Sequence, residues 1–522
     1  MARIFLVRLH YMTMEEVALR IEDLLCYGVE KLGLSVEDKA YARNQLLELF
    51  QVEPAFKDGN LPEDMSELIE ELTDYALDNG VCEDGEEARF ETRLMGLITP
   101  SPSSVVYRYN EVYRQEGIRA ATRYLYNLSV DNFYIRLKDI RKNLCWYAKG
   151  KKGRIAITIN LSKPEKDPKQ VLAEKQFTGR KYPMCMLCME NIGFCGTATL
   201  PARQTLRHIP VTLNGEPWHM QFSPYLYYDE HIIVFNEKHL PMQITDKTPV
   251  RLLSFVRRYP FYFLGSNADL PIVGGSILSH DHYQGGRKVL PMFSRGYRKI
   301  YYTNEEVNVG VKDWYNSVVT LRGKDPDEVA KKAATVIDVW KTYSDPENDV
   351  IAESNGVRHN TVTPVAYYKD GYYVFDLILR NNRTDEAHPF GIFHPTEDMH
   401  NIKKEAIGLI EAMGLFILPG RLKGELGALM TELTKEKPDL EMISKDEKLS
   451  KHFNMFVQIM ADHGTGLTPE KAQEVVLEAV NKVCFRILEC TAVFKNDKKG
   501  KDGMERFIRA VVIEDNKRNG RE

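Results

Sequence analysis

The sequence predicts an α+β protein in which helical regions at both ends flank a strand-rich centre. Helix-start signals followed by apolar residues at helical spacing dominate residues 1–175 and the last part of the chain. Between them lie short apolar runs and alternating apolar and polar residues, bounded by turn residues, which are typical of strands. At 522 residues the chain is long enough to bury a large core without disulfide bonds.

Local signals predict the elements in order along the chain. Thr13 followed by Glu16 forms a capping-box pattern that starts a first helix. A second helix is expected after Pro62. Its apolar face would consist of Met65, Leu68, Ile69, Leu72 and Ala76. Ile155, Ile157 and Ile159 then alternate with more polar residues and predict a strand, and the polar residues 163–175 predict a linker.

The centre and the end of the chain carry equally local signals. Asp325 as N-cap and Pro326 at the first helical position predict a helix that ends near residue 343. Residues 362–368 and 372–379 flank a Lys-Asp-Gly sequence, which predicts a β-hairpin. Thr468 and Pro469 begin a last, strongly amphipathic helix.

Composition excludes several classes of protein. The 70 Lys and Arg nearly balance 74 Asp and Glu, so the net charge of −4 does not favour nucleic-acid binding. No apolar run approaches the about 18 residues of a transmembrane helix, and the start lacks the features of a secretory signal. The 8 cysteines are scattered, which favours reduced thiols and a cytoplasmic protein that does not bind membranes.

The most informative segment is Asp269 to Gly286. If residues 278–284 are extended, His280, His282 and Gln284 share one face of the strand. A neutral imidazole attacks phosphorus well, and an amide can bond to a phosphoryl oxygen without gaining or losing a proton. The pattern therefore indicates group transfer through a phospho-imidazole. The alternative is a hydrogen-bonded pair of core histidines.

Paired glycines bracket this segment. Gly274 and Gly275 precede the histidines, and Gly285 and Gly286 follow them. Because glycine lacks Cβ, such pairs allow a bulky ligand to approach the backbone closely.

A second motif is Cys185-x-x-Cys188. Alone it fits a redox pair, half of a zinc site or chance. A zinc site needs two more donors, and spacing does not choose among the histidines downstream. These are His208, His219, His231, His239 and His280.

Together these segments resemble the galactose-1-phosphate uridylyltransferase family, and in particular its sequence-divergent type II branch. The resemblance covers nearly the whole chain. It rests on Asp269 to Gly286 and on further segments, which are 182–191, 234–239, 379–382, 403–414 and 418–422. It implies a duplicated histidine-triad-like fold of antiparallel sheet modules with helical additions at both ends. The implied regions are a helical 1–175, a catalytic module 176–330, a second module 331–425 and a helical 426–522.

The resemblance also implies an activity and its residues. The family transfers UMP from UDP-glucose to galactose 1-phosphate by double displacement, often as a homodimer. Its nucleophilic histidine falls on His282, and the glutamine that holds the intermediate falls on Gln284. Related hydrolases carry a third histidine in place of this glutamine. Since an amide cannot carry out acid–base steps, Gln284 favours a transferase over a hydrolase.

Further site residues follow from the same resemblance. Cys185, Cys188, His239 and His280 correspond to a zinc site, in which His280 would anchor the active-site strand. Asn267 corresponds to a substrate-contacting asparagine. The other expected substrate contacts are Gly274, Gly275, Ser276 and Gly285. Candidates for phosphate contacts are Arg380, Lys403, Lys404 and Arg421.

Two other functions compete with this interpretation. A nucleotide hydrolase, or a nucleotidyltransferase with another acceptor, would use the same nucleophile. A zinc-stabilised protein that binds nucleotides without chemistry would be indifferent to the residue type at Gln284.

Overall fold

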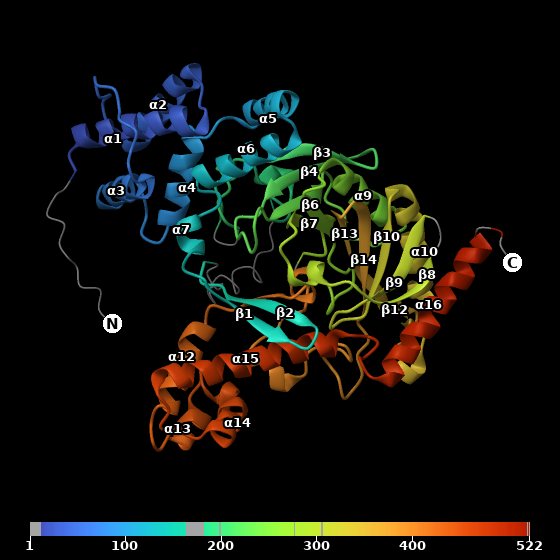
Figure 1. Cartoon of the computed structure of the whole chain (residues 1–522). Coiled ribbons are helices and arrows are strands. Elements are labelled where there is room, and N and C mark those ends of the chain that lie inside the picture. Colours follow the sequence, from blue (N-terminus) through green and yellow to red (C-terminus); the bar gives the residue numbers. More distant parts are fainter. Residues whose placement is uncertain are drawn as a thin grey trace. The chain divides into compact units, whose positions relative to one another are not determined.

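The computed structural model describes residues 12–162, 182–197, 200–275, 277–303, 306–518 and 520. The chain forms two compact units. The first comprises residues 1–137, 166–211 and 219–224, and the second comprises 138–165, 212–218 and 225–522. Figure 1 shows the helices and strands of both units.

The first unit is mostly helical. Its elements are α1 (Met14–Tyr27), η1 (Gly28–Leu32), α2 (Val36–Phe50), α3 (Met65–Asp78), α4 (Glu87–Ile98), α5 (Pro102–Glu116), α6 (Ile118–Asp131) and η2 (Met189–Asn191). The short α7 (Leu137–Ile140) follows α6 in the chain. The expected capping box is confirmed, because the Thr13 hydroxyl accepts from the Glu16 N–H and the Glu16 carboxylate accepts from the Thr13 N–H.

Most strands belong to one ten-stranded sheet. Its members are β3 (Ile209–Leu213), β4 (Glu216–Phe222), β5 (Ile232–Asn236), β6 (Tyr262–Gly265), β7 (His282–Arg287), β8 (Tyr297–Thr303), β9 (Val307–Lys312), β10 (Val318–Gly323), β13 (Asn360–Lys369) and β14 (Tyr372–Asn381). A separate three-stranded sheet holds β1 (Leu144–Gly150), β2 (Gly153–Ile159) and β15 (Leu415–Leu418). The short strands β11 (Glu353–Ser354) and β12 (Val357–Arg358) pair with each other.

The second unit also contains all the described helices that follow residue 225. They are α9 (Lys247–Arg258), α10 (Pro326–Thr342), α11 (Leu409–Ala412), α12 (Leu422–Leu433), α13 (Leu440–Lys445), α14 (Phe453–His463), α15 (Pro469–Thr491) and α16 (Lys498–Arg518). The unit also holds short 3₁₀ turns, namely η3 (Pro291–Ser294), η4 (Pro346–Asn348), η5 (Glu397–Met399) and η6 (Ser450–His452). The helix starts at Pro326 and Pro469 are confirmed, and Asp325 and Thr468 cap them as expected.

The large sheet is built from two similar halves. Its spatial order is β3-β4-β5-β7-β6-β13-β14-β10-β9-β8. In chain order each half has three strands, a helix and two strands, and in each half the last strand lies between the third and the fourth. The halves meet where β6 pairs antiparallel with β13, with Gly265 opposite Val365. The mirrored order supports the expected duplication and makes β14 the counterpart of β7.

The predicted β-hairpin and the early strand are also confirmed. β13 and β14 pair across a two-residue turn at Asp370 and Gly371, whose φ values are 52° and 80°. Such positive φ values belong to the tight turn that Asp-Gly favours. Ile155, Ile157 and Ile159 are buried on one side of β2. The expected linker at 163–175 lies outside the described residues.

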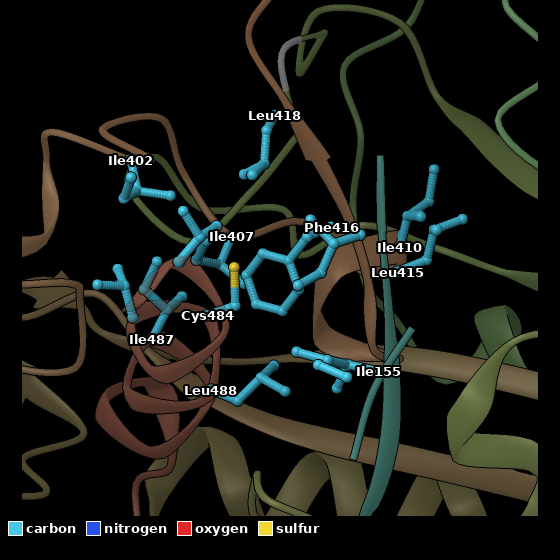
Figure 2. Packing of buried hydrophobic residues seen from close by; sticks show 14 of the residues in the cluster. Ile155, Ile402, Ile407, Ile410, Leu415, Phe416, Leu418, Cys484, Ile487 and Leu488 are labelled. Atoms are coloured by element: carbon cyan, nitrogen blue, oxygen red, sulfur yellow. The ribbon is translucent and has the colours of Figure 1, made fainter. Parts of the chain in front are cut away.

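The core of the second unit joins the small sheet to the C-terminal helices. In Figure 2, Phe416 of β15 and Ile155 of β2 lie beside Cys484, Ile487 and Leu488 of α15. These side chains are almost wholly removed from water, which is the main favourable contribution to folding. Among the described residues, no helix has the length and apolar character needed to cross a membrane.

Candidate active site and metal centre

The active-site strand is shorter than expected. β7 begins at His282, so His280 precedes it at a bend rather than lying within an extended run. From His282 the strand is regular and pairs with β5 on one side and β6 on the other. His282 and Gln284 therefore do point to one face of the sheet, since side chains alternate along a strand.

Backbone geometry fixes the tautomer of His282. Its Nδ1 lies 2.8 Å from the carbonyl oxygen of His280, which can only accept, so Nδ1 carries the proton and donates it. Nε2 consequently keeps its lone pair. Burial lowers the pKa of His282 to about 4, so the imidazole is neutral at pH 7. A neutral imidazole with a free Nε2 lone pair is suited to attack phosphorus.

Gln284 is held by a histidine that the sequence did not single out for this role. Nε2 of His231 lies 3.2 Å from Oε1 of Gln284. Nδ1 of His231 is buried and has no hydrogen-bond partner among the residues that the structure describes, and a bare lone pair there is tolerated better than a buried N–H without an acceptor. Nε2 therefore carries the proton and donates it to the Gln284 oxygen.

The surroundings of His231 keep it in this form. The rings of Tyr227 and Tyr228 lie 5.6 and 4.5 Å from its ring centre. Burial lowers the pKa of His231 to about 4, so the imidazole stays neutral. Because the Gln284 oxygen is occupied, its NH₂ group is left to donate elsewhere.

The four expected metal ligands lie together. One ligand atom from each of Cys185, Cys188, His239 and His280 lies within 4.8 Å of all the others. The Sγ atoms of Cys185 and Cys188 are 3.6 Å apart. Two thiolates on tetrahedral zinc, each about 2.3 Å from the ion, would be about 3.8 Å apart. The spacing and the donor chemistry therefore fit a divalent metal ion.

The environment of these ligands also fits a metal. Nε2 of His280 lies 2.8 Å from the backbone oxygen of Asn236, so it donates its proton there and leaves Nδ1 as the ligand atom. Metal-binding histidines usually donate their second N–H to such an acceptor. In the absence of a cation, burial raises the pKa of Cys185 to about 12. A bound cation would offset that cost by stabilising the thiolate.

Asn267 and the glycines pack against the chain itself. Oδ1 of Asn267 accepts from the backbone N–H of Leu409 at 2.8 Å. A Cβ on Gly275 would lie 2.5 Å from Nδ2 of Asn267, and one on Gly274 would lie 2.6 Å from a backbone oxygen. Gly285 is equally confined, at 2.2 Å from the Phe263 oxygen. Close chain packing thus requires these glycines, and their contact with substrate stays a prediction.

The remaining expected contacts are Ser276 and the candidates for phosphate binding, and the candidates differ in whether an acidic residue already pairs with them. Ser276 lies outside the described residues. Arg380 on β14 is 1% exposed, and within the described part of the chain its guanidinium nitrogens have no hydrogen-bond partner. Lys403 pairs with Glu411 at 3.0 Å, and Arg421 pairs with Glu425 at 2.5 Å. Of the phosphate candidates, Arg380 is the one whose burial without a partner most favours an anionic ligand.

Comparisons with known proteins agree with this site. The family model described as galactose-1-phosphate uridyl transferase, N-terminal domain, matches residues 33–241, and the corresponding C-terminal domain matches residues 255–449. A curated galactose-1-phosphate uridylyltransferase from Caldanaerobacter subterraneus is 44% identical, with 95% of this chain and 98% of that protein covered. The protein of that name from Bacillus subtilis is 43% identical over 94% of this chain and 96% of its own length.

Proposed function

Because the chain belongs to the galactose-1-phosphate uridylyltransferase family, we propose that it transfers UMP from UDP-glucose to galactose 1-phosphate through a covalent bond to His282. The observation that carries the proposal is the hydrogen bond from Nδ1 of His282 to the His280 oxygen. This bond directs the lone pair of Nε2 toward a reacting group and holds the ring in place.

The reaction has two balanced steps. Nε2 of His282 attacks the α-phosphorus of UDP-glucose, so an N–P bond forms and the P–O bond to glucose 1-phosphate breaks. A phosphate oxygen of galactose 1-phosphate then attacks the same phosphorus, forms UDP-galactose and returns the electron pair to Nε2. The covalent intermediate thus divides one difficult displacement into two easier ones.

Gln284 serves both steps without exchanging protons. Its NH₂ group donates to a non-bridging oxygen of the transferred phosphoryl group and stabilises the charge that develops there. Because the bond from His231 fixes which end of the amide faces the ligand, this donor is in place before substrate binds. His231 is therefore a positioning residue.

A test of the function supplies both substrates. Incubation with UDP-glucose and galactose 1-phosphate is expected to yield UDP-galactose and glucose 1-phosphate in equal amounts, with little free UMP. Steady UMP release without an acceptor would instead support the nucleotide hydrolase. Tight binding of UDP-glucose without turnover would support a binding protein. A panel of hexose 1-phosphates defines the range of acceptors.

Removing the positioning bond tests the role of His231. The substitution His231→Phe keeps an aromatic ring between the tyrosines but removes the N–H donor. We expect kcat to fall by about tenfold, the value of one neutral hydrogen bond, while KM changes little. His231→Gln restores a donor and is expected to recover part of kcat. Full kcat in His231→Phe, or a larger loss in His231→Gln than in His231→Phe, would show that His231 acts through packing rather than through its N–H donor.

We further propose that the metal held by Cys185, Cys188, His239 and His280 is zinc. Two thiolates and two imidazoles form a closed tetrahedral set, which is typical of structural zinc. The ion would keep both cysteines ionised and hold the chain at His280, next to His282. The family resemblance also implies a homodimer, which stays a prediction.

Metal analysis tests the zinc proposal. The purified chain is expected to contain one zinc ion per chain, and Cys188→Ser is expected to lose most of it and to melt several degrees lower. Cys145→Ser removes an exposed thiol outside the group and serves as the control. Equal metal content in the two variants would contradict the assignment.

A further inference from the structure

A cavity lies in the half of the large sheet that lacks the active-site histidines. In register, Gln284 lies opposite Gly265, Gly265 opposite Val365, and Val365 opposite Asp376. Directly paired residues share a face of the sheet. Asp376 on β14 therefore lies on the same face as Gln284 on β7, and β14 is the topological counterpart of β7.

A cavity of about 220 Å³ opens on this face beside β14. Tyr367, Val374 and Arg322 line it, and they form one row across β13, β14 and β10. Each is two residues along its strand from the row that contains Asp376, so all three share its face. The cavity thus occupies, in the second half of the sheet, the place that corresponds to the surroundings of β7 in the first.

The lining of this cavity is strongly cationic. It includes Arg295, Lys312, Arg322 and Lys369, with Asp370 as the lining carboxylate. Lys312 is 2% exposed and pairs with Asp376 at 3.1 Å, and Arg295 pairs with Asp313.

The other two cations contact neutral groups, although the Asp370 carboxylate lines the same cavity. Arg322 stacks on the Tyr372 ring at 4.0 Å, and Lys369 donates to the Phe293 carbonyl at 2.9 Å. Among the described residues neither forms an ion pair with a carboxylate. Their charges therefore remain available to an anion in the cavity. Arg is the residue that best matches phosphate geometry, and Lys adds a point charge.

We propose that this cavity is a second binding site, separate from the active site, for a phosphate monoester of monosaccharide size. The about 220 Å³ of space lies below the about 300 Å³ at which sites for drug-sized ligands begin, so its size matches a monosaccharide phosphate better than a nucleotide sugar. Arg322 and Lys369 would bind the phosphate, while the ring of Tyr297, whose hydroxyl donates to the Asn308 oxygen, offers an aromatic surface to the remainder of the ligand. The proposal does not depend on which reaction occurs at His282.

The test measures binding of radiolabelled glucose 6-phosphate and of inorganic phosphate by equilibrium dialysis. The full-length His282→Ala chain is used with saturating UDP-glucose, which occupies the active site without turnover. One equivalent of glucose 6-phosphate is expected to bind per chain, and neutral glucose is not expected to compete. Arg322→Gln and Lys369→Gln are each expected to weaken binding about tenfold to a hundredfold.

Matched variants separate the cavity from general charge effects. Lys324→Gln removes an exposed cation that follows β10 and does not line the cavity, and it is expected to bind normally. Arg322→Lys keeps a charge and is expected to bind with intermediate affinity. Introduced into the otherwise wild-type chain, Arg322→Gln and Lys369→Gln are expected to leave UMP transfer unchanged. No saturable binding, displacement of the probe by UDP-glucose, or equal affinity in all variants would overturn the proposal.

Discussion

Replacing His282 by alanine is expected to lower UMP transfer by at least about 10⁴-fold, because the covalent route through Nε2 is lost. The remaining hydrogen bonds would still position the two substrates. However, direct displacement between two phosphate dianions lacks the nucleophile that the histidine supplies. Steady-state assays of UDP-galactose formation measure the loss.

The controls for this prediction separate chemistry from folding. His388→Ala removes a half-exposed histidine that pairs with Asp385 at 2.8 Å and forms no hydrogen bond with the site residues in the described part of the chain, and it is expected to keep full activity. Binding of UDP-glucose to His282→Ala is expected to persist. Transfer by His282→Ala within about tenfold of the unsubstituted chain would contradict a covalent role for this residue.

Replacing Gln284 by histidine is expected to convert part of the transfer into hydrolysis. An amide cannot accept a proton, whereas an imidazole can take one from an attacking water molecule. General base catalysis typically contributes about 10²–10⁴-fold, so release of UMP to water is expected to rise by at least about 10²-fold. The measurement is free UMP formed from UDP-glucose without an acceptor.

A second substitution at this position isolates the acid–base effect. Gln284→Ala also removes the amide but supplies no base, so it is expected to slow transfer without raising UMP release. Equal rates of UMP release from the alanine and histidine variants would show that proton transfer at this position does not decide between transfer and hydrolysis.

Local signals in the sequence predicted the elements that depend on neighbouring residues. Thr13 and Glu16 cap α1, and Pro326 and Pro469 start α10 and α15, because each needs only residues within one helical turn. The Asp370-Gly371 turn is equally local, since both residues tolerate positive φ. Such features follow from backbone sterics and capping, which the sequence records directly.

Contacts between distant residues were harder to predict. His231 lies 53 residues from Gln284, and nothing in the sequence distinguishes it from the other histidines. Only the pairing of β5 with β7 brings it beside the amide. The spacing of the cysteines likewise does not identify His239 as a metal ligand. That assignment came from the family resemblance. The sequence does not predict that β7 starts at His282, because a bend at His280 leaves no signal in the alternation of residue types.

The central claim is most directly tested by the mass of the intact chain after incubation with UDP-glucose alone. We predict one UMP adduct per chain, located on His282, with release of an equal amount of glucose 1-phosphate. Addition of galactose 1-phosphate is then expected to remove the adduct and form UDP-galactose. Rapid turnover to UDP-galactose with no adduct at any time, or an adduct on a residue other than His282, would contradict the mechanism.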